Sequence, residues 1–569
     1  MGSISMDEMD MPRLEKTPTS SQLVVHGKPF LMLGAELQNS SMSTAAYMRT
    51  AWPKLVEGHI NTVLGAVTWE DIEPTEGNFD FSELSQVITD ARHHGLHLIV
   101  LWFGSFKNGM STYIPHWVKK DHKRFPRARV READGRLKTV ECLSLFGQEE
   151  SCRADAKAFS ALMAFLNDTD RNHSTVIMVQ VENEVGFLGD SRDRSPAAEK
   201  AFEQPVPSDL TTFLLEKWSS LHPFLQDNLK IFHALAEKGV STTESSWESV
   251  FGASQHTDEV FMAYHYAKYV EAVAVAGHPH FNVPLYTNVW MNYVGDSNEF
   301  PSVAGGGGCP GDYPSGGAVI NTLDIWHRFA PTLSFISPDI YLNDYVAVCA
   351  GYRHNNQPLM IPEQRRDEHG ARRIWSAIGT HLAIGVSPFG IDTLEVHENL
   401  YVRHYKLLQS VAPIVLEAQR KPGTSFGFFF DEFSTSEPQK PWVVTFGDLE
   451  LTIERAFVFG TPGPGSGMVI WKGGMTFLLL GWGYRVTFRS TKREATFTGI
   501  LRFDEKEVAD AENGDLRTAR KLNGDETRAG LHVNMPNEDP DYGGFPIAIT
   551  IPSRTMLAEV EVYTLEEED

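Results

Sequence analysis

Two glutamates, Glu184 and Glu363, each stand at the end of a short apolar run. Residues 176–183 precede the first and residues 358–362 precede the second. Short apolar runs are typical of buried strands in a parallel sheet. A carboxylate that follows such a strand lies where (β/α)₈ barrels carry their reactive groups. Two of them suggest the carboxylate pair that cleaves a glycosidic bond, although a structural role, such as capping by Glu184, is the favoured interpretation of either glutamate alone.

The elements that must position this pair follow a repeating pattern between residues 21 and 410. Amphipathic helical stretches alternate with eight apolar runs, and this alternation predicts an α/β fold, a (β/α)₈ TIM barrel. The predicted strands are 31–36, 60–67, 97–103, 175–182, 284–290, 333–341, 358–363 and 382–391. On this count Glu184 follows strand four and Glu363 ends strand seven. Both carboxylates are then expected at the same end of the barrel.

Two connections between the predicted strands are long. Residues 104–152 follow strand three and residues 185–283 follow strand four. Both leave the carboxyl end of a strand, so we expect both to build the rim above the reactive groups. The glycine run at 305–308 predicts a further rim loop after strand five.

The pattern changes beyond residue 410. Short alternating runs separated by turn residues predict a C-terminal antiparallel β-sandwich-like domain at 411–569. Residues 1–20 read as a flexible tail and residues 21–410 as the catalytic barrel. The stretch 505–545 is rich in Asp, Glu, Asn and Gly and predicts a surface excursion. The β-runs of the domain are 426–430, 442–446, 475–480 and 484–488.

Composition excludes several classes of partner. The chain has 50 Lys and Arg against 74 Asp and Glu, a net charge of −24, which argues against nucleic acid and anionic membranes as partners. Its first residues lack the basic start and apolar core of a signal peptide, which favours a cytoplasmic location unless the N-terminus was trimmed. The sequence leaves a homo-oligomer open.

Four cysteines are present and none forms a CxxC pair, so a zinc site is not expected. We expect free thiols, although a Cys142–Cys152 bridge stays open on spacing alone. No HExxH motif accompanies the histidines, and no GxSxG elbow precedes a helix, so a serine hydrolase is not expected. No metal and no organic cofactor is implied.

Residues beside the glutamates are candidates for holding a sugar. Asn183 directly precedes Glu184 and could hydrogen-bond the sugar 2-hydroxyl, a contact that strengthens in the transition state. Tyr341 ends strand six and could hydrogen-bond Glu363. Trp290 ends strand five and could form an aromatic platform. Packing or rim structure explains the last two residues equally well.

Further candidates follow strands one and three. Glu36 ends strand one, where a substrate contact is one interpretation. Trp102, Lys107 and Asn108 lie at or after strand three and could line a pocket. As isolated residues, all four are equally consistent with structural roles.

Two segments resemble a known family. Residues 180–186 (QVENEVG) resemble a motif of glycoside hydrolase family 35 β-galactosidases, and residues 69–82 (WEDIEPTEGNFDFS) resemble a signature of families 35 and 42. The resemblance covers about residues 22–410 and is strongest to a microbial branch with its own C-terminal β-domain. It implies a retaining, exo-acting β-glycosidase acting on an oligosaccharide or glycoside, with Glu184 as acid/base and Glu363 as nucleophile.

The sequence departs from that pattern after strand three. Galactose-specific members carry Ala-Glu-Trp there, and this chain reads LWFGSFKN at 101–108, without a carboxylate. The departure concerns the sugar and leaves the hydrolytic pair untouched. Three alternatives therefore stay open: a β-glucosidase-type activity, a transglycosylase using the same pair, and a non-catalytic carbohydrate-binding barrel.

Overall fold

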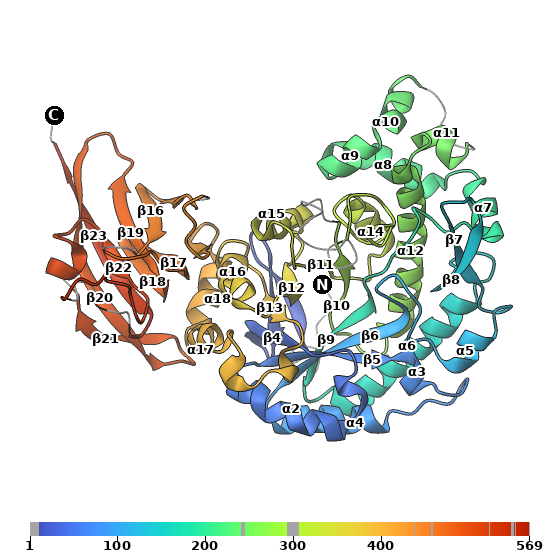
Figure 1. The fold of residues 1–569 in the computed structure, drawn as a ribbon, viewed down its shortest axis with the longest axis horizontal. Helices are drawn as coiled ribbons and strands as arrows, with labels where there is room; N and C mark the ends of the chain where they lie inside the picture. Colours follow the sequence, from blue (N-terminus) through green and yellow to red (C-terminus); the bar gives the residue numbers. More distant parts are fainter. Residues whose placement is uncertain are drawn as a thin grey trace, which may run out of the picture.

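A computed structural model describes residues 11–239, 245–292, 306–436, 439–456, 459–522, 524–547, 551 and 554–567. The chain forms a barrel followed by a smaller β-domain, which lies beside the barrel on the left of Figure 1. The predicted fold class is confirmed. The domain boundary between residues 410 and 411 stays a prediction.

Eight parallel strands form the barrel, in the sheet order β11-β10-β9-β6-β5-β4-β13-β12. The backbone N–H of Ile340 donates to the Glu363 carbonyl at 2.9 Å, which closes the sheet between its two edge strands. All eight predicted strands are confirmed. They are β4 (Met32–Glu36), β5 (Thr62–Thr68), β6 (His97–Lys107), β9 (Val176–Asn183), β10 (Leu285–Trp290), β11 (Phe335–Asp339), β12 (Met360–Gln364) and β13 (Gly385–Pro388).

Apolar side chains from the strands fill the barrel. They form one buried cluster of their own, separate from the larger cluster that the strands share with the surrounding helices. Filling by side chains makes the barrel a packed core rather than a channel. The cluster includes Met32, Leu64, Ile99, Met178, Tyr286, Phe335, Met360 and Ile384.

Helices cover the outside of the barrel between successive strands (Figure 1). Each buries an apolar face against the strands, as the amphipathic stretches predict. They are α2 (Ala45–Glu57), α3 (Trp69–Ile72), α4 (Ser82–His93), α6 (Glu150–Asp170), α12 (Gln255–Gly277), α14 (Leu323–Phe329), α15 (Tyr345–Gly351), α16 (Glu368–Gly379), α17 (Val402–Ser410) and α18 (Ala412–Arg420).

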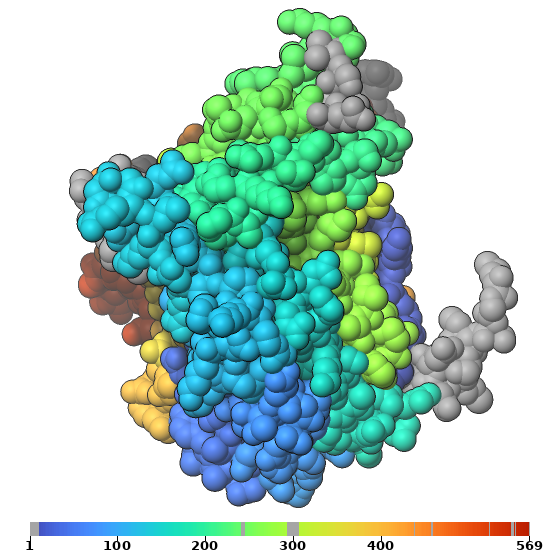
Figure 2. Space-filling view, turned by 90° about the vertical axis from the view of Figure 1, so that its right-hand side faces the viewer, coloured from blue at the N-terminus to red at the C-terminus, as the bar shows by residue number. Residues whose placement is uncertain are grey.

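The two long connections form a layer on one flank of the barrel. In Figure 2 the green segment of the second connection lies above the blue units of the barrel. Asp193 of the second connection accepts from the Arg129 backbone N–H of the first at 3.0 Å, which ties the two together. Their elements are α5 (His116–Lys120), β7 (Arg127–Arg131), β8 (Leu137–Leu143), α7 (Pro196–Phe202), α8 (Ser208–Lys217), α9 (Pro223–Asn228), α10 (Lys230–Glu237) and α11 (Trp247–Phe251).

The predicted tail contains ordered structure. Residues 1–10 lie outside the described residues, but β1 (Arg13–Lys16) pairs antiparallel with β2 (Ser21–Val25), which pairs with β3 (Lys28–Pro29). Tertiary contacts explain why composition missed this strand: Arg420 of α18 hydrogen-bonds Gln22 at 2.5 Å and lies 3.3 Å from Glu15. A flexible tail is therefore the wrong description of residues 13–16.

The C-terminal domain consists of two antiparallel sheets around a buried aromatic and aliphatic core. The predicted β-runs are confirmed. The predicted surface excursion at 505–545 is wrong in its first part, where residues 504–510 pair antiparallel with residues 515–521. The strands are β14 (Ser425–Phe430), β15 (Trp442–Phe446), β16 (Leu449–Arg455), β17 (Gly465–Gly473), β18 (Thr476–Trp482), β19 (Tyr484–Ser490), β20 (Ala495–Asp510), β21 (Asp515–Lys521), β22 (Val533–Met535) and β23 (Leu557–Glu566).

The domain packs closely against α16 of the barrel. A Cβ added at Gly427 in β14 would lie 1.7 Å from the Trp375 carbonyl oxygen, so this contact requires glycine. Arg373 of α16 donates to both carboxyl oxygens of Asp431 at 2.8 Å. Trp482 of β18 is buried beneath the Arg403 guanidinium, 3.7 Å from its ring centre.

All four cysteines are free, as expected. No helix in the described part of the chain is both long and apolar enough to cross a bilayer. Gly305 of the predicted rim loop lies outside the described residues, as do residues 293–304 before it.

Candidate active site

The two glutamates meet at the carboxyl ends of their strands. Glu184 directly follows β9 and Glu363 is the second-last residue of β12, so both lie at strand ends as predicted. Both side chains are buried. Asp339, the last residue of β11, joins them. One carboxyl oxygen of each of the three lies within 4.8 Å of the others.

The backbone of Glu184 is held in an unusual conformation. Its φ of 45° lies in the left-handed region, which is uncommon for residues other than glycine. The Glu184 N–H donates to Asn288 Oδ1 at 2.9 Å, and its carbonyl accepts from the Gly109 N–H at 3.1 Å. Such backbone strain persists where surrounding contacts fix it and is concentrated at functional sites.

Glu363 receives one hydrogen bond from a neighbouring strand. The Tyr341 hydroxyl donates to Glu363 Oε1, as predicted from the sequence. Burial, followed by the charge of Glu363, raises the pKa of Tyr341 well above its ordinary value, so the hydroxyl keeps its proton. The Glu36 carboxyl also hydrogen-bonds the Glu363 carboxyl, while Glu363 Oε2 is buried and accepts from no N–H group or hydroxyl of the described residues.

Lys107 and Asn183 form a second polar pair beside the carboxylates. The buried Lys107 Nζ donates to Asn183 Oδ1 at 2.9 Å. This bond uses the amide oxygen and leaves the amide nitrogen, Asn183 Nδ2, free to donate. That buried group has no partner within the described residues. An unsatisfied buried donor is costly, so a ligand hydroxyl at this position would be favoured.

Glu36 brings a fourth carboxyl to the cluster from the end of β4. Burial and then the charge of Glu363 raise the pKa of Glu36 well above its ordinary value, and Lys107 opposes this shift. The side chain is only 2% exposed. Glu36 therefore adds an acidic group from strand one where the sequence lacks a carboxylate after strand three.

The surroundings give Glu184 the properties of a proton donor. Burial, followed by the charge of Glu363, raises the pKa of Glu184 to about 7, while Lys107 opposes the shift. A carboxyl with this pKa is protonated at slightly acidic pH and can later accept a proton.

Trp102 does not line the site, and its prediction as a pocket residue is wrong. Its indole N–H donates to Asp155 of α6 at 2.9 Å, and its ring packs against Phe159 of the same helix. Both faces of β6 are buried, so sequence periodicity could not show which way Trp102 points.

Two predicted residues lie at the rim, and their sugar contacts stay predictions. Trp290 ends β10 half-buried, with Gly306 against its indole nitrogen. Asn108 has a left-handed φ of 53°, and its buried Oδ1 has no partner among the described residues.

Asp339 and Asn288 belong to the site and were not predicted from the sequence. Asn288 Nδ2 donates to Asp339 Oδ2 at 2.7 Å. Both residues lie inside predicted strands, and a polar residue within an apolar run was the available signal. Strand alternation places Asn288 and Trp290 on one face of β10.

Three clustered carboxylates have the donor set for a divalent cation if all are ionised. Burial, followed by the charges of Glu363 and Glu184, raises the pKa of Asp339 well above its ordinary value. Together with the raised pKa of Glu184, this favours protonated forms, which do not bind a cation.

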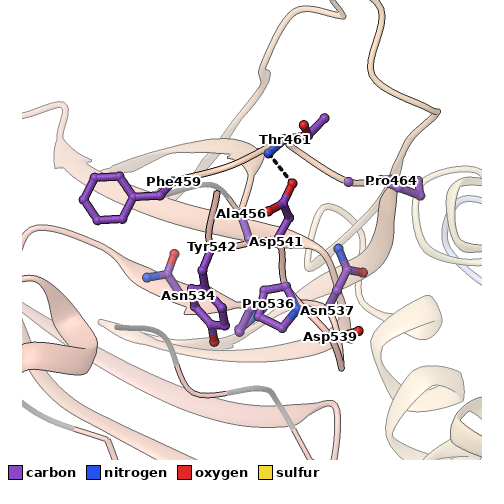
Figure 3. A pocket seen from close by; sticks show the side chains of 12 residues that line it. Ala456, Phe459, Thr461, Pro464, Asn534, Pro536, Asn537, Asp539, Asp541 and Tyr542 are labelled. Carbon is purple, nitrogen blue, oxygen red and sulfur yellow. Dashed lines mark hydrogen bonds between the residues drawn. The ribbon is translucent and has the colours of Figure 1, made fainter. Parts of the chain in front are cut away.

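A separate cavity of about 260 Å³ lies in the C-terminal domain (Figure 3). Phe459, Thr461 and Tyr542 are among its lining residues, and Asp541 accepts from the Thr461 backbone N–H at 2.8 Å. The residues that line it all follow position 455, so it is distinct from the carboxyl cluster.

One family model matches the first half of the barrel. The family model described as beta-galactosidase of glycoside hydrolase family 42 matches residues 44–251, which include Asn183 and Glu184 but not Glu363. The match covers less than half of the chain. Over these residues the similarity is to family 42 and not to the predicted family 35. The two families share the second-strand signature at residues 69–82, which explains the error.

A second model, of a domain of unknown function (DUF5597), matches residues 401–534. No curated protein matches the chain.

Solved structures with a similar arrangement include two β-galactosidases and a β-amylase domain. The β-galactosidase from the psychrophilic Marinomonas ef1 is 14% identical, with a TM-score of 0.45 over 69% of this chain and 62% of that one. The β-galactosidase from Bacillus circulans sp. alkalophilus is 15% identical, with a TM-score of 0.43 over 68% and 57%. The catalytic domain of a Paenibacillus polymyxa β-amylase is 12% identical, with a TM-score of 0.43 over 66% and 97%. The chain thus spans about 60% of the length of both β-galactosidases.

Proposed function

We propose that the protein is a retaining, exo-acting β-glycosidase that hydrolyses β-linked sugars through a two-glutamate double displacement. The supporting observation is the separation of Glu184 and Glu363, whose nearest carboxyl oxygens lie within 4.8 Å. Retaining enzymes hold their carboxyl groups about 5–5.5 Å apart, whereas inverting enzymes leave about 6.5–9.5 Å for a water molecule.

In the first step Glu184 donates its proton to the glycosidic oxygen while Glu363 attacks the anomeric carbon. The bond to the leaving group breaks and a glycosyl ester forms on Glu363. Tyr341 donates to Oε1 of Glu363, so we propose Oε2, which no hydroxyl or N–H group contacts in the described residues, as the attacking atom. In the second step Glu184 takes a proton from water, and the water oxygen displaces Glu363 from the sugar.

The sugar-binding groups proposed here are neutral or acidic, apart from Lys107. The Asn183 Nδ2 would donate to the 2-hydroxyl, and Glu36 would accept from another hydroxyl. Because Glu184 and Glu363 are only 7% and 8% exposed, we propose attack at the end of a glycan rather than within it. β-Galactosides are the first substrates to test, and β-glucosides the second.

The test is turnover of a panel of aryl β-glycosides by wild-type protein and by Glu363→Gln. We expect the substitution to lower kcat by at least about 10³-fold because it removes the nucleophile. Glu417→Gln, on the exposed surface of α18, is the matched control and should leave kcat unchanged. Full activity of Glu363→Gln would contradict the assignment.

The same assay addresses the remaining alternatives. Adding a sugar acceptor and analysing the products separates hydrolysis from transglycosylation. A wild-type protein that binds sugars but turns over none of the panel would favour the carbohydrate-binding barrel.

A further inference from the structure

Asp339 is an acid that the two-glutamate mechanism does not use. It ends β11, its side chain is 4% exposed, and it approaches both Glu184 and Glu363 within 4.8 Å. An extra buried carboxyl is costly unless its protonation state and hydrogen bonds are arranged to suit it. Its surroundings therefore indicate which form it takes.

Asn288 fixes the orientation of Asp339. The amide Oδ1 accepts from the Glu184 N–H at 2.9 Å, so the amide Nδ2 must point the other way, and it donates to Asp339 Oδ2 at 2.7 Å. Asp339 Oδ2 is therefore an acceptor. Asp339 Oδ1 is buried and accepts no hydrogen bond from the described residues, while the Asp339 carboxyl hydrogen-bonds the Glu184 carboxyl, which leaves Oδ1 as the atom that can carry a proton.

The charges around Asp339 also disfavour its ionised form. Each neighbouring strand contributes a titratable or charged group, and Lys107 is the cation among them. Ionising Asp339 would place another negative charge among buried carboxyls, which costs several kcal/mol in general. The groups are Glu36 of β4, Lys107 of β6, Glu184 after β9, Tyr286 of β10, Tyr341 after β11 and Glu363 of β12.

We propose that Asp339 is a positioning residue that stays protonated and donates its Oδ1 hydrogen to the carboxylate of Glu184. This inference rests on the proposed function. When Glu184 gives its proton to the glycosidic oxygen, Asp339 keeps its own proton and stabilises the new carboxylate by a hydrogen bond. The bond tightens as the charge forms, as catalytic hydrogen bonds commonly do between the free and the reacting enzyme.

Substitution by asparagine separates this role from that of an ionised carboxylate. In Asp339→Asn the amide oxygen can accept from Asn288 and the amide N–H can donate to Glu184, which preserves both bonds of the protonated acid. In Asp339→Ala both bonds are lost. A role that needs negative charge, including cation binding, would be lost in both variants.

The experiment measures kcat/KM against pH for wild type, Asp339→Ala and Asp339→Asn with a substrate whose leaving group needs protonation. We expect kcat/KM to fall about 100-fold in Asp339→Ala. In Asp339→Asn, kcat/KM should be at least about tenfold higher than in Asp339→Ala. The alkaline limb of the alanine variant should move to higher pH by about one unit, because the Glu184 carboxylate loses a donor.

The opposite sign would overturn the proposal. If Asp339 is ionised, removing its charge lowers the pKa of Glu184, and the alkaline limb moves to lower pH in both variants. Equal losses in both variants, with unchanged thermal midpoints, would overturn it too, as would inactivation of the wild type by EDTA. If Asp339→Ala does not fold, the direction of the shift in Asp339→Asn decides alone.

An infrared spectrum provides a readout that does not depend on turnover. At neutral pH the spectrum of the wild type minus that of Asp339→Asn should contain a protonated-carboxyl band, because the other protonated carboxyls are present in both proteins, and the absence of this difference band would contradict the protonated form. The activity of Glu363→Gln distinguishes a failure of the Asp339 proposal from a failure of the proposed function. An active wild type with an inactive Glu363→Gln keeps the proposed function even if the Asp339 variants disagree.

Discussion

Glu184 and Glu363 are the same kind of side chain in different surroundings. Glu184 carries a strained backbone and a pKa raised to about 7, chiefly by burial. Glu363 accepts a hydrogen bond from Tyr341, which fixes the orientation of its carboxyl group. Two carboxyls whose environments differ in this way can act as acid and nucleophile at the same pH.

The pH dependence follows from Glu184. Its pKa is raised from 4.5 to about 7, so the acid form persists to about pH 7 and is lost above it. We expect kcat/KM for a poor leaving group to fall about tenfold per pH unit above 7. An activated aryl leaving group should show a weaker dependence, because it needs less protonation. A rate that already falls above pH 5 would contradict this assignment.

At this scale the sequence located the reactive pair but not its neighbours. Glu184 and Glu363 are recognisable because each ends an apolar run. Asp339 ends β11 and Asn288 lies two residues before the end of β10, but both are inside predicted runs where a polar residue could face the barrel or the helices. Trp102 shows the reverse error, because β6 is buried on both faces and its direction is not encoded in apolarity.

Strands and helices were more predictable than single side chains. Apolar runs located all eight barrel strands, since each strand is buried on both faces and bounded by polar segments. β1 and the pairing of β20 with β21 were missed because charged and exposed residues dominate them. Their pairing depends on partners distant in the chain, which local composition does not reveal.

The contact between β14 and α16 depends on Gly427. Replacing it with alanine would place a methyl group 1.7 Å from the Trp375 carbonyl oxygen, so the two elements must separate. We expect Gly427→Ala to lower the free energy of unfolding by about 3 kcal/mol, measured by denaturant titration. Gly463→Ala is the control, since its nearest neighbour is the mobile end of Asn537. Equal stabilities of the two variants would refute the close contact.

At the scale of the whole molecule, the C-terminal domain lies on one side of the barrel (Figure 1). Its contacts concentrate on α16, the helix that directly follows the strand of Glu363. We propose that the domain holds this helix, and through it β12, in place. Sequence alone predicted that a β-domain follows the barrel but could not show which helix it contacts.

The strength of the contact between the C-terminal domain and α16 can be measured at the Arg373–Asp431 pair. The guanidinium is 10% exposed and makes two bonds of 2.8 Å, so a double-mutant cycle should give a coupling of about 1–3 kcal/mol. The exposed Arg153–Glu149 pair is the control and should give below about 0.5 kcal/mol. Equal couplings would mean that the interface adds little to stability.

The central claim is that Glu363 becomes covalently bound to the sugar. The most direct measurement is mass spectrometry of the protein after reaction with an activated β-glycoside whose glycosyl-enzyme hydrolyses slowly. The account predicts one added glycosyl mass, mapped to the peptide that contains Glu363. An active enzyme that forms no adduct and releases the inverted anomer first would contradict it.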